Sequence, residues 1–207
     1  MAELYTTIER EAVAEFEEKK SIFIGHAMPV KTEEEAAAFV KDLKNKYRDA
    51  THNVFAYVLG DGTVQRYSDD GEPQGTAGMP VLDVIRKSGC TDTAVVVTRY
   101  FGGTLLGAGG LVRAYSHAAK LALDDAHIIT YEKYAVLKLI CTYSDYGKYL
   151  SETEKFGLIN DGVDFAENVS MNLAVKNSRL ADFEKLIRDI SNGKLSTEKV
   201  GERFDFR

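Results

Sequence analysis

Apolar side chains recur with a period of two or of about four along the first half of the chain, and each period predicts a different element. Residues 11–30 alternate apolar and polar positions, which predicts two strands. Thr32 and Glu35 have the spacing of a capping box, and an apolar face with helical period follows them. Residues 54–67 contain two β-rich runs around a Gly-Asp-Gly turn, which predicts a hairpin.

The pattern then predicts a helix, a strand and a longer helix. Pro80 suits the first turn of a helix, and Gly89 suits its end. Residues 94–98 form a continuous apolar run, which is typical of a strand that is covered on both faces. The long helix that follows has Leu111 and Tyr115 on its apolar side. We therefore expect a two-layer α/β domain over residues 1–128.

The pattern restarts after Asp125. Alternating and helical runs predict a strand, a helix, two strands, a second helix and a last strand that reaches about Phe206. The order β-α-β-β-α-β is that of the ferredoxin-like split βαβ motif. We therefore expect a domain change at about 126–133 and a ferredoxin-like domain over residues 133–207.

Composition narrows the class of protein. The chain has 207 residues, of which 44% are hydrophobic and 28% are charged, as in ordinary globular proteins. It contains no apolar run of about 18 residues and no signal-like start, so we expect a soluble cytoplasmic protein. Cys90 and Cys141 stand alone in the sequence, which predicts buried thiols in a reducing compartment and no metal site.

Charge is unevenly distributed. The net charge of −6 argues against a protein that coats nucleic acid over its whole surface. Residues 84–123, however, carry five basic side chains, among them Arg99 and Arg113, against Asp92 alone. Such a stretch is either a local patch that attracts phosphate groups or the solvated face of a helix.

Glycine is concentrated in the same region: 11 of the 17 glycines lie between Gly60 and Gly110. Some precede the long helix, whose free N–H groups and dipole make an anion site beside Arg99 and Arg113. The spacing fits neither a Walker A loop nor a GxGxxG fingerprint, so we expect no nucleotide cofactor. The alternative is a glycine-rich turn that serves helix–strand packing.

An acidic run, Asp69, Asp70 and Glu72, comes before this region. Three neighbouring carboxylates suggest Mg²⁺ binding or acid–base chemistry. The Asp-Asp-Gly-Glu-Pro segment is also a good turn, and we favour the turn because no second carboxylate cluster or histidine pair completes a metal site. His52 precedes a strand and is either a structural residue or part of the same surface.

Several of these segments together resemble the IMPACT family, most closely its bacterial YigZ-type members. The matching motifs are Asp49-Ala50-Thr51-His52, Tyr67 to Pro73, Gly75 to Gly78 with Pro80, Arg99 to Gly103, and Leu106 to Tyr115. The resemblance implies an N-terminal fold similar to ribosomal-protein, translation-factor and GHMP-kinase domains, and a C-terminal domain similar to ferredoxin-like domains of elongation factor G.

The resemblance also implies a class of function. Eukaryotic relatives are translational regulators that compete for an activator of the kinase of initiation factor 2, through additional regions that this chain lacks. For bacterial members, nucleic-acid binding is suggested by fold and surface charge.

We therefore predict a non-enzymatic regulatory protein of translation or stress response that binds RNA or a ribosome-associated partner. Arginine would hold phosphate while aromatic rings stack on bases. The predicted binding residues are Arg99, Tyr100, Gly102, Gly103, Gly107, Gly109, Gly110 and Arg113. The alternative is an enzyme for a small anionic substrate, with Glu72 or Asp70 as base and His52 as acid or orienting group. In either case we expect His52, Asp69, Glu72, Arg99 and Arg113 to border one cleft.

Overall fold

A computed structural model describes residues 4–206, which form two compact units. One unit comprises residues 5–130, and the other comprises residues 131–206 with Leu4. The chain is a mixed α+β protein with five α-helices in its described part. No helix among these residues is long and apolar enough to cross a membrane.

The first unit is built on a five-stranded sheet with the order β2-β3-β6-β4-β5, in which neighbouring strands are antiparallel. The central strand β6 is buried from Thr93 to Arg99, as its apolar run predicted. The strands are β2 (Ala12–Glu18), β3 (Ser21–Pro29), β4 (His52–Leu59), β5 (Val64–Ser68) and β6 (Thr93–Tyr100).

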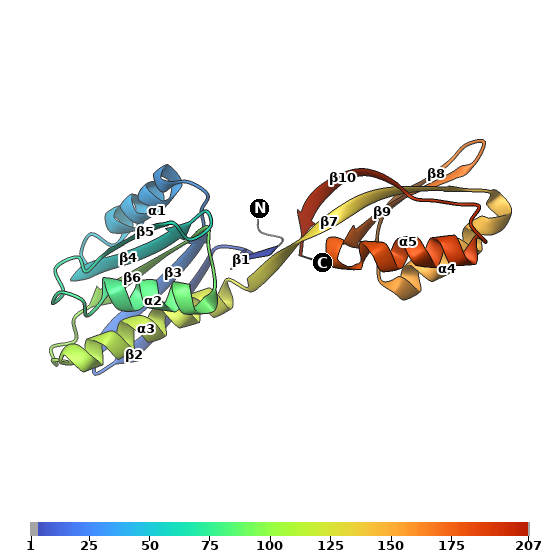
Figure 1. Cartoon of the computed structure of the whole chain (residues 1–207). Helices are drawn as coiled ribbons and strands as arrows, with labels where there is room; N and C mark the ends of the chain where they lie inside the picture. The colour runs from blue at the N-terminus through green and yellow to red at the C-terminus, as the bar shows by residue number, and fades with distance from the viewer. Residues whose placement is uncertain (1–3, 207) are drawn as a thin grey trace. The chain divides into compact units, whose positions relative to one another are not determined.

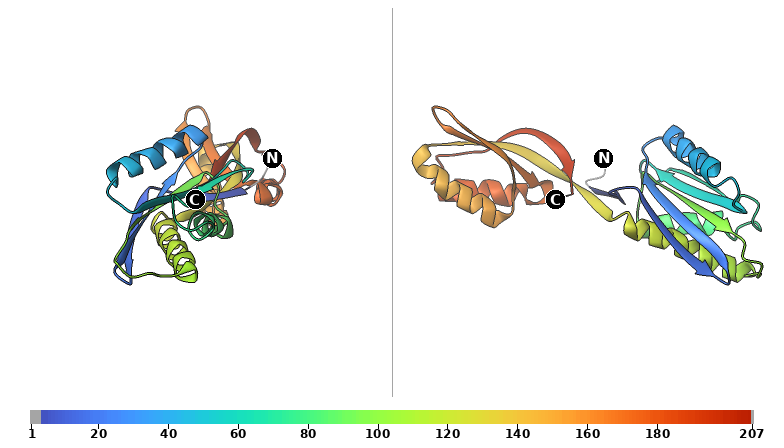
Figure 2. Two further views of the ribbon diagram at one scale, coloured as in Figure 1. Left: turned by 90° about the vertical axis from the view of Figure 1, so that its left-hand side faces the viewer. Right: turned by 180° about the vertical axis from the view of Figure 1, so that it is seen from behind.

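Helices cover both faces of this sheet. One face packs against α1 (Glu33–Lys46), and the other packs against α2 (Gly78–Ser88) and α3 (Ala108–Asp125). Figure 1 and the two further views of Figure 2 show α1 on the side of the strands opposite to α2 and α3. The unit therefore has three layers rather than the expected two, because alternate side chains of β4 and β6 enter two separate cores.

The predicted helix signals act as expected. Thr32 Oγ1 accepts a hydrogen bond from Glu35 N at 3.2 Å, and Gly89 ends α2 in the left-handed conformation with φ 73°. Helix α2 begins at Gly78, so Pro80 lies in its first turn, as expected. A proline is tolerated there because N–H groups of the first turn have no intrahelical partner.

The second unit has the expected order of elements around a sheet with the strand order β10-β7-β9-β8. The sequence pattern missed β1 (Leu4–Ile8), which pairs with β7. Regular structure continues through the stretch where the domain change was expected, because β7 begins at Ile128. The elements are β7 (Ile128–Cys141), α4 (Tyr143–Phe156), β8 (Ile159–Phe165), β9 (Val169–Lys176), η1 (Asn177–Arg179), α5 (Leu180–Ile190) and β10 (Glu198–Asp205).

Candidate functional site

The acidic segment before α2 is a turn, and two of its three carboxylates hold the backbone in place. Asp69 accepts hydrogen bonds from the N–H groups of Gly75, Ala77 and Gly78 at 2.8, 3.1 and 2.8 Å. It therefore caps the start of α2, whose N-cap residue Ala77 has no side-chain acceptor. The turn closes with the hydrogen bond from Glu72 N to Asp69 O at 3.0 Å. The turn prediction is confirmed.

Both carboxylate oxygens of Asp70 are also occupied by contacts within the protein. Its Oδ1 contacts Lys44 Nζ at 2.5 Å, and its Oδ2 accepts a hydrogen bond from Asn53 N at 2.7 Å. All four carboxylate oxygens of Asp69 and Asp70 therefore accept at least one hydrogen bond from the protein itself. Within residues 4–206, no group of three or more His, Cys, Asp and Glu side chains is placed to hold a metal ion.

Glu72 differs from both aspartates because it enters the interior of the unit. Its Oε1 accepts a hydrogen bond from Arg99 Nη1 at 2.5 Å and another from the Tyr115 hydroxyl at 2.7 Å. Arg99 comes from β6 and Tyr115 from α3, and the exposed fractions of Glu72, Arg99 and Tyr115 are 8%, 5% and 0%. Burial, together with the Glu72 carboxylate, raises the pKa of the Tyr115 hydroxyl. We call these three residues the buried triad.

Two polar atoms of the buried triad remain without a partner among the described residues. Glu72 Oε2 accepts no hydrogen bond and is not fully buried, so it is the oxygen left open to solvent. Arg99 Nε is fully buried and has no partner. The guanidinium group of Arg99 lies 5.4 Å from the ring centre of Phe23 and 5.5 Å from that of Phe101, so two aromatic faces hold it.

His52 lies beside the buried triad with a defined tautomer. Its Nδ1 is 2.8 Å from the carbonyl oxygen of Asp70, and a carbonyl only accepts, so Nδ1 carries the hydrogen. In the neutral ring Nε2 is then a free acceptor, and it lies 3.8 Å from Glu72 Oε1. The register of the sheet explains the position, because His52 of β4 pairs directly with Arg99 of β6.

These residues line a cavity of about 410 Å³, which we call the His52–Glu72 cavity. Its polar side comprises His52, Glu72 and Arg99, and the start of α3 forms part of its wall. The remaining wall is largely apolar. The complete lining is Thr51, His52, Glu72, Pro73, Arg99, Phe101, Leu105, Leu106, Gly107, Ala108 and Leu111.

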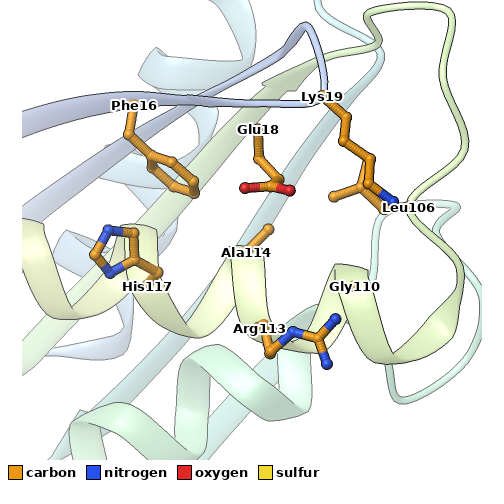
Figure 3. A pocket seen from close by; sticks show the side chains of 8 residues that line it. All are labelled: Phe16, Glu18, Lys19, Leu106, Gly110, Arg113, Ala114 and His117. Carbon is orange, nitrogen blue, oxygen red and sulfur yellow. The ribbon is translucent and has the colours of Figure 1, made fainter.

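Arg113 does not reach this cavity. It lines a neighbouring one of about 250 Å³, and Leu106 lines both. Figure 3 shows the second cavity, with Phe16, Glu18 and Lys19 extending from β2 and the turn after it towards α3, which carries Gly110, Arg113, Ala114 and His117. Of the five residues expected to border one cleft, His52, Glu72 and Arg99 line the same cavity. Arg113 lines the neighbouring cavity, and Asp69 lines neither.

The predicted binding glycines differ in the structural reason for which glycine is needed at each position. A Cβ on Gly102 would lie 1.9 Å from the carbonyl carbon of Lys20, so this glycine serves packing. Gly107 precedes the first residue of α3 with φ 71°, a conformation that favours glycine. Gly103 and Gly109 have no close neighbour, and a Cβ on Gly110 would meet only the flexible Leu106 side chain at 2.9 Å.

Sequence reasoning missed part of the site. The sequence analysis assigned Tyr115 to the apolar face of a helix. Its hydroxyl group could have indicated the site, because a buried tyrosine needs a hydrogen-bond partner. Lys19 gave no signal, since only the fold brings the β2–β3 turn beside α3. Tyr100, which was predicted as a binding residue, donates its hydroxyl hydrogen to Asp49 at 3.1 Å.

Comparison with known proteins agrees with the motifs on which the site is built. Residues 19–123 match the model of the Impact N-terminal domain, and residues 139–194 match a domain of unknown function (DUF1949). The IMPACT family member YvyE of Bacillus subtilis (strain 168) is 36% identical over 203 residues, which cover 98% of this chain and 93% of that protein. The IMPACT family member YigZ of Escherichia coli (strain K12) is 33% identical over 190 residues, which cover 89% and 92%.

A solved structure described as the crystal structure of an hypothetical protein is similar over 97% of this chain and 99% of its own, with a TM-score of 0.61 and 30% sequence identity. The residues of the His52–Glu72 cavity from His52 to Leu111 all lie within the matched N-terminal domain. The resemblance seen in the sequence is thereby confirmed: this chain belongs to the IMPACT family.

Proposed function

We propose that this chain is a cytoplasmic, non-enzymatic regulatory protein, linked to translation or the stress response, that binds single-stranded RNA around the start of α3. The RNA would be free or part of a ribosome-associated partner. The proposed binding surface comprises Lys19, Lys20, Phe101, Leu105 and Arg113 with the first turn of α3, and we call it the α3 rim.

The observation that carries the proposal is a set of basic groups left unpaired beside a helix start. Arg86 and Lys120 pair with aspartates on their own helices. Lys19, Lys20 and Arg113, in contrast, form no ion pair with any residue between positions 4 and 206. Free cations next to unpaired helical N–H groups suit a phosphate backbone.

The turn between β2 and β3 adds to this argument. Lys19 and Lys20 have φ values of 48° and 66°, the left-handed conformation that hairpin turns normally give to Asn-Gly. Turn geometry alone does not favour two lysines at these positions, which supports a role for them in phosphate contacts. The backbone of Lys20 abuts Gly102, so the turn lies against the loop that leads into α3.

The same surface offers places for bases. Leu105 is 82% exposed and Phe101 is 46% exposed, and both line the His52–Glu72 cavity. Aromatic and apolar groups beside cations form the usual platform for single strands. Arg99 supports this platform by holding the Phe101 ring, and it does not serve as a free cation because it is paired with Glu72.

The test is the salt dependence of RNA binding. In fluorescence anisotropy with a labelled single-stranded RNA, the double change Lys19→Ala and Arg113→Ala should weaken binding and lower the slope of log K against log salt by about 1.4, or about 0.7 for each lost phosphate contact. The matched control Arg86→Ala with Lys87→Ala removes the same charge from the last turn of α2 and should leave the slope unchanged. An equal effect of both double changes would show that binding depends only on net charge, and it would refute the α3 rim as the binding surface.

His52 favours a second candidate function, an enzyme for a small anionic substrate. Its free Nε2 lies in a cavity beside a helix start, so a proton acceptor and an anion site share one space. Of the groups considered from the sequence, Asp70 is the less suitable base, because each of its oxygens already accepts a hydrogen bond from the protein. Mass spectrometry of phosphorylated and carboxylated metabolites incubated with the protein would reveal turnover that His52→Phe abolishes. No turnover across the panel would eliminate this candidate.

We also infer the two kinships that the resemblance implied. The strand order β10-β7-β9-β8 with two helices supports a ferredoxin-like second unit. The kinship of the first unit with ribosomal-protein and GHMP-kinase domains rests on the family resemblance.

A further inference from the structure

We infer that the His52–Glu72 cavity takes the base of one nucleotide of the bound strand and selects guanine. The inference rests on the proposed RNA binding and names what the cavity adds to it. A cavity of about 410 Å³ falls within the ordinary range of small-ligand sites, roughly 300–1,000 Å³.

The polar atoms of the cavity wall define which base fits. Glu72 Oε2 is an acceptor without a hydrogen-bond partner among the described residues, and so is His52 Nε2 in the neutral ring, in which Nδ1 carries the hydrogen. Glu72 is more than nine-tenths buried, and Oε2 is its oxygen left open to solvent, so a base that displaces this solvent must donate a hydrogen bond in its place. With His52 neutral, the cavity therefore offers two acceptors to the donors of its occupant.

Thr51 supplies the complementary group. Its Oγ1 accepts a hydrogen bond from Phe101 N at 3.0 Å, which leaves the hydroxyl hydrogen to donate. Two acceptors and one donor match the guanine edge, which presents the N1–H and N2–H donors next to the O6 acceptor. Adenine, cytosine and uracil each present at most one donor position on the corresponding edge, so each leaves an acceptor of the cavity unpaired.

The rest of the lining suits a planar ring attached to a phosphate. Pro73, Phe101, Leu105, Leu106 and Leu111 give apolar walls. Gly107 and Ala108 bring the start of α3 to the same cavity, and the first N–H groups of a helix have no intrahelical partner. A nucleotide can therefore place its phosphate at the helix start and its base inside, which joins the cavity to the α3 rim.

The experiment compares RNA heptamers of adenylates that carry guanosine, inosine or adenosine at the central position, by anisotropy at one salt concentration. We expect about tenfold tighter binding with guanosine than with adenosine, the scale of a good bidentate base contact. Inosine lacks the N2 amino group and should fall between them. His52→Phe keeps a ring but removes an acceptor, and it should abolish the preference without breaking the pair of Glu72 and Arg99. The matched exchange His117→Phe, in the second cavity, should retain it.

The outcomes separate the inference from the function on which it rests. Binding of all three heptamers with equal affinity would overturn guanine selection and leave RNA binding by the α3 rim intact. A preference that survives His52→Phe would likewise place the selection outside the cavity. Failure of every heptamer to bind, at low salt and with folded protein, would overturn the proposed function itself.

Discussion

Exchanging Arg99 for methionine should strongly destabilise the first unit, because it leaves Glu72 as a buried carboxylate without its cationic partner. Arg99 is 5% exposed, and its Nη1 lies 2.5 Å from Glu72 Oε1. After the exchange only the Tyr115 hydroxyl would remain as a donor to that oxygen. Removing one partner of a buried pair costs about 3–5 kcal/mol of unfolding free energy. For a unit of this size the melting temperature should fall by roughly 10–15 °C.

Removing both charges should cost less than removing one. The double change Glu72→Leu with Arg99→Met eliminates the unpaired carboxylate, and replacing both members of a buried pair by apolar residues is often close to neutral. Urea unfolding followed by circular dichroism would measure both variants. Lys120→Met provides the control, because it breaks an exposed pair with Asp124 on α3 and should change the free energy of unfolding by less than about 0.5 kcal/mol. A single Arg99 variant as stable as the control, or a double variant less stable than the single one, would refute the electrostatic reasoning.

Three further predictions concern stability. Gly102→Ala should lower the free energy of unfolding by several kcal/mol or prevent folding, because the new Cβ would lie 1.9 Å from backbone atoms. Gly109→Ala would place a Cβ no closer than 3.8 Å to any neighbour and should stabilise α3 by about 0.5–1 kcal/mol. Thermal melts of the two variants check this contrast. Burial, with a smaller contribution from Lys46, lowers the pKa of His26 to about 4. The unfolded chain therefore binds more protons between about pH 6.5 and 4, and stability falls as the pH drops through this window by up to about 3 kcal/mol; His26→Gln should flatten that loss in urea titrations at pH 4 and 7. Asp69→Asn should destabilise the unit by about 1–3 kcal/mol, since a neutral amide replaces the charged acceptor of three N–H groups, and a denaturation midpoint equal to that of the wild type would contradict the capping role.

The sequence by itself determined most of the elements, because their signals are local. The capping box at Thr32 and the stop at Gly89 depend on residues within one turn of each other. The continuous apolar run in β6 required cover on both faces, which already implied a layer beyond the two that we expected. The family motifs directed attention to the segments that line the His52–Glu72 cavity.

Only the tertiary structure decided how those segments act together. Glu72 is separated from Arg99 by 27 positions and from Tyr115 by 43, and nothing local to either segment encodes their contact. The register of β4 with β6 places His52 opposite Arg99, and a shift by one residue would turn these side chains to the other face of the sheet. The path of α3 past the β2–β3 turn sends Arg113 into the second cavity with Lys19. Side chains of the family motifs therefore separate into a capping group, a buried pair and an exposed cation, because strand register and helix placement depend on the packing of the whole unit.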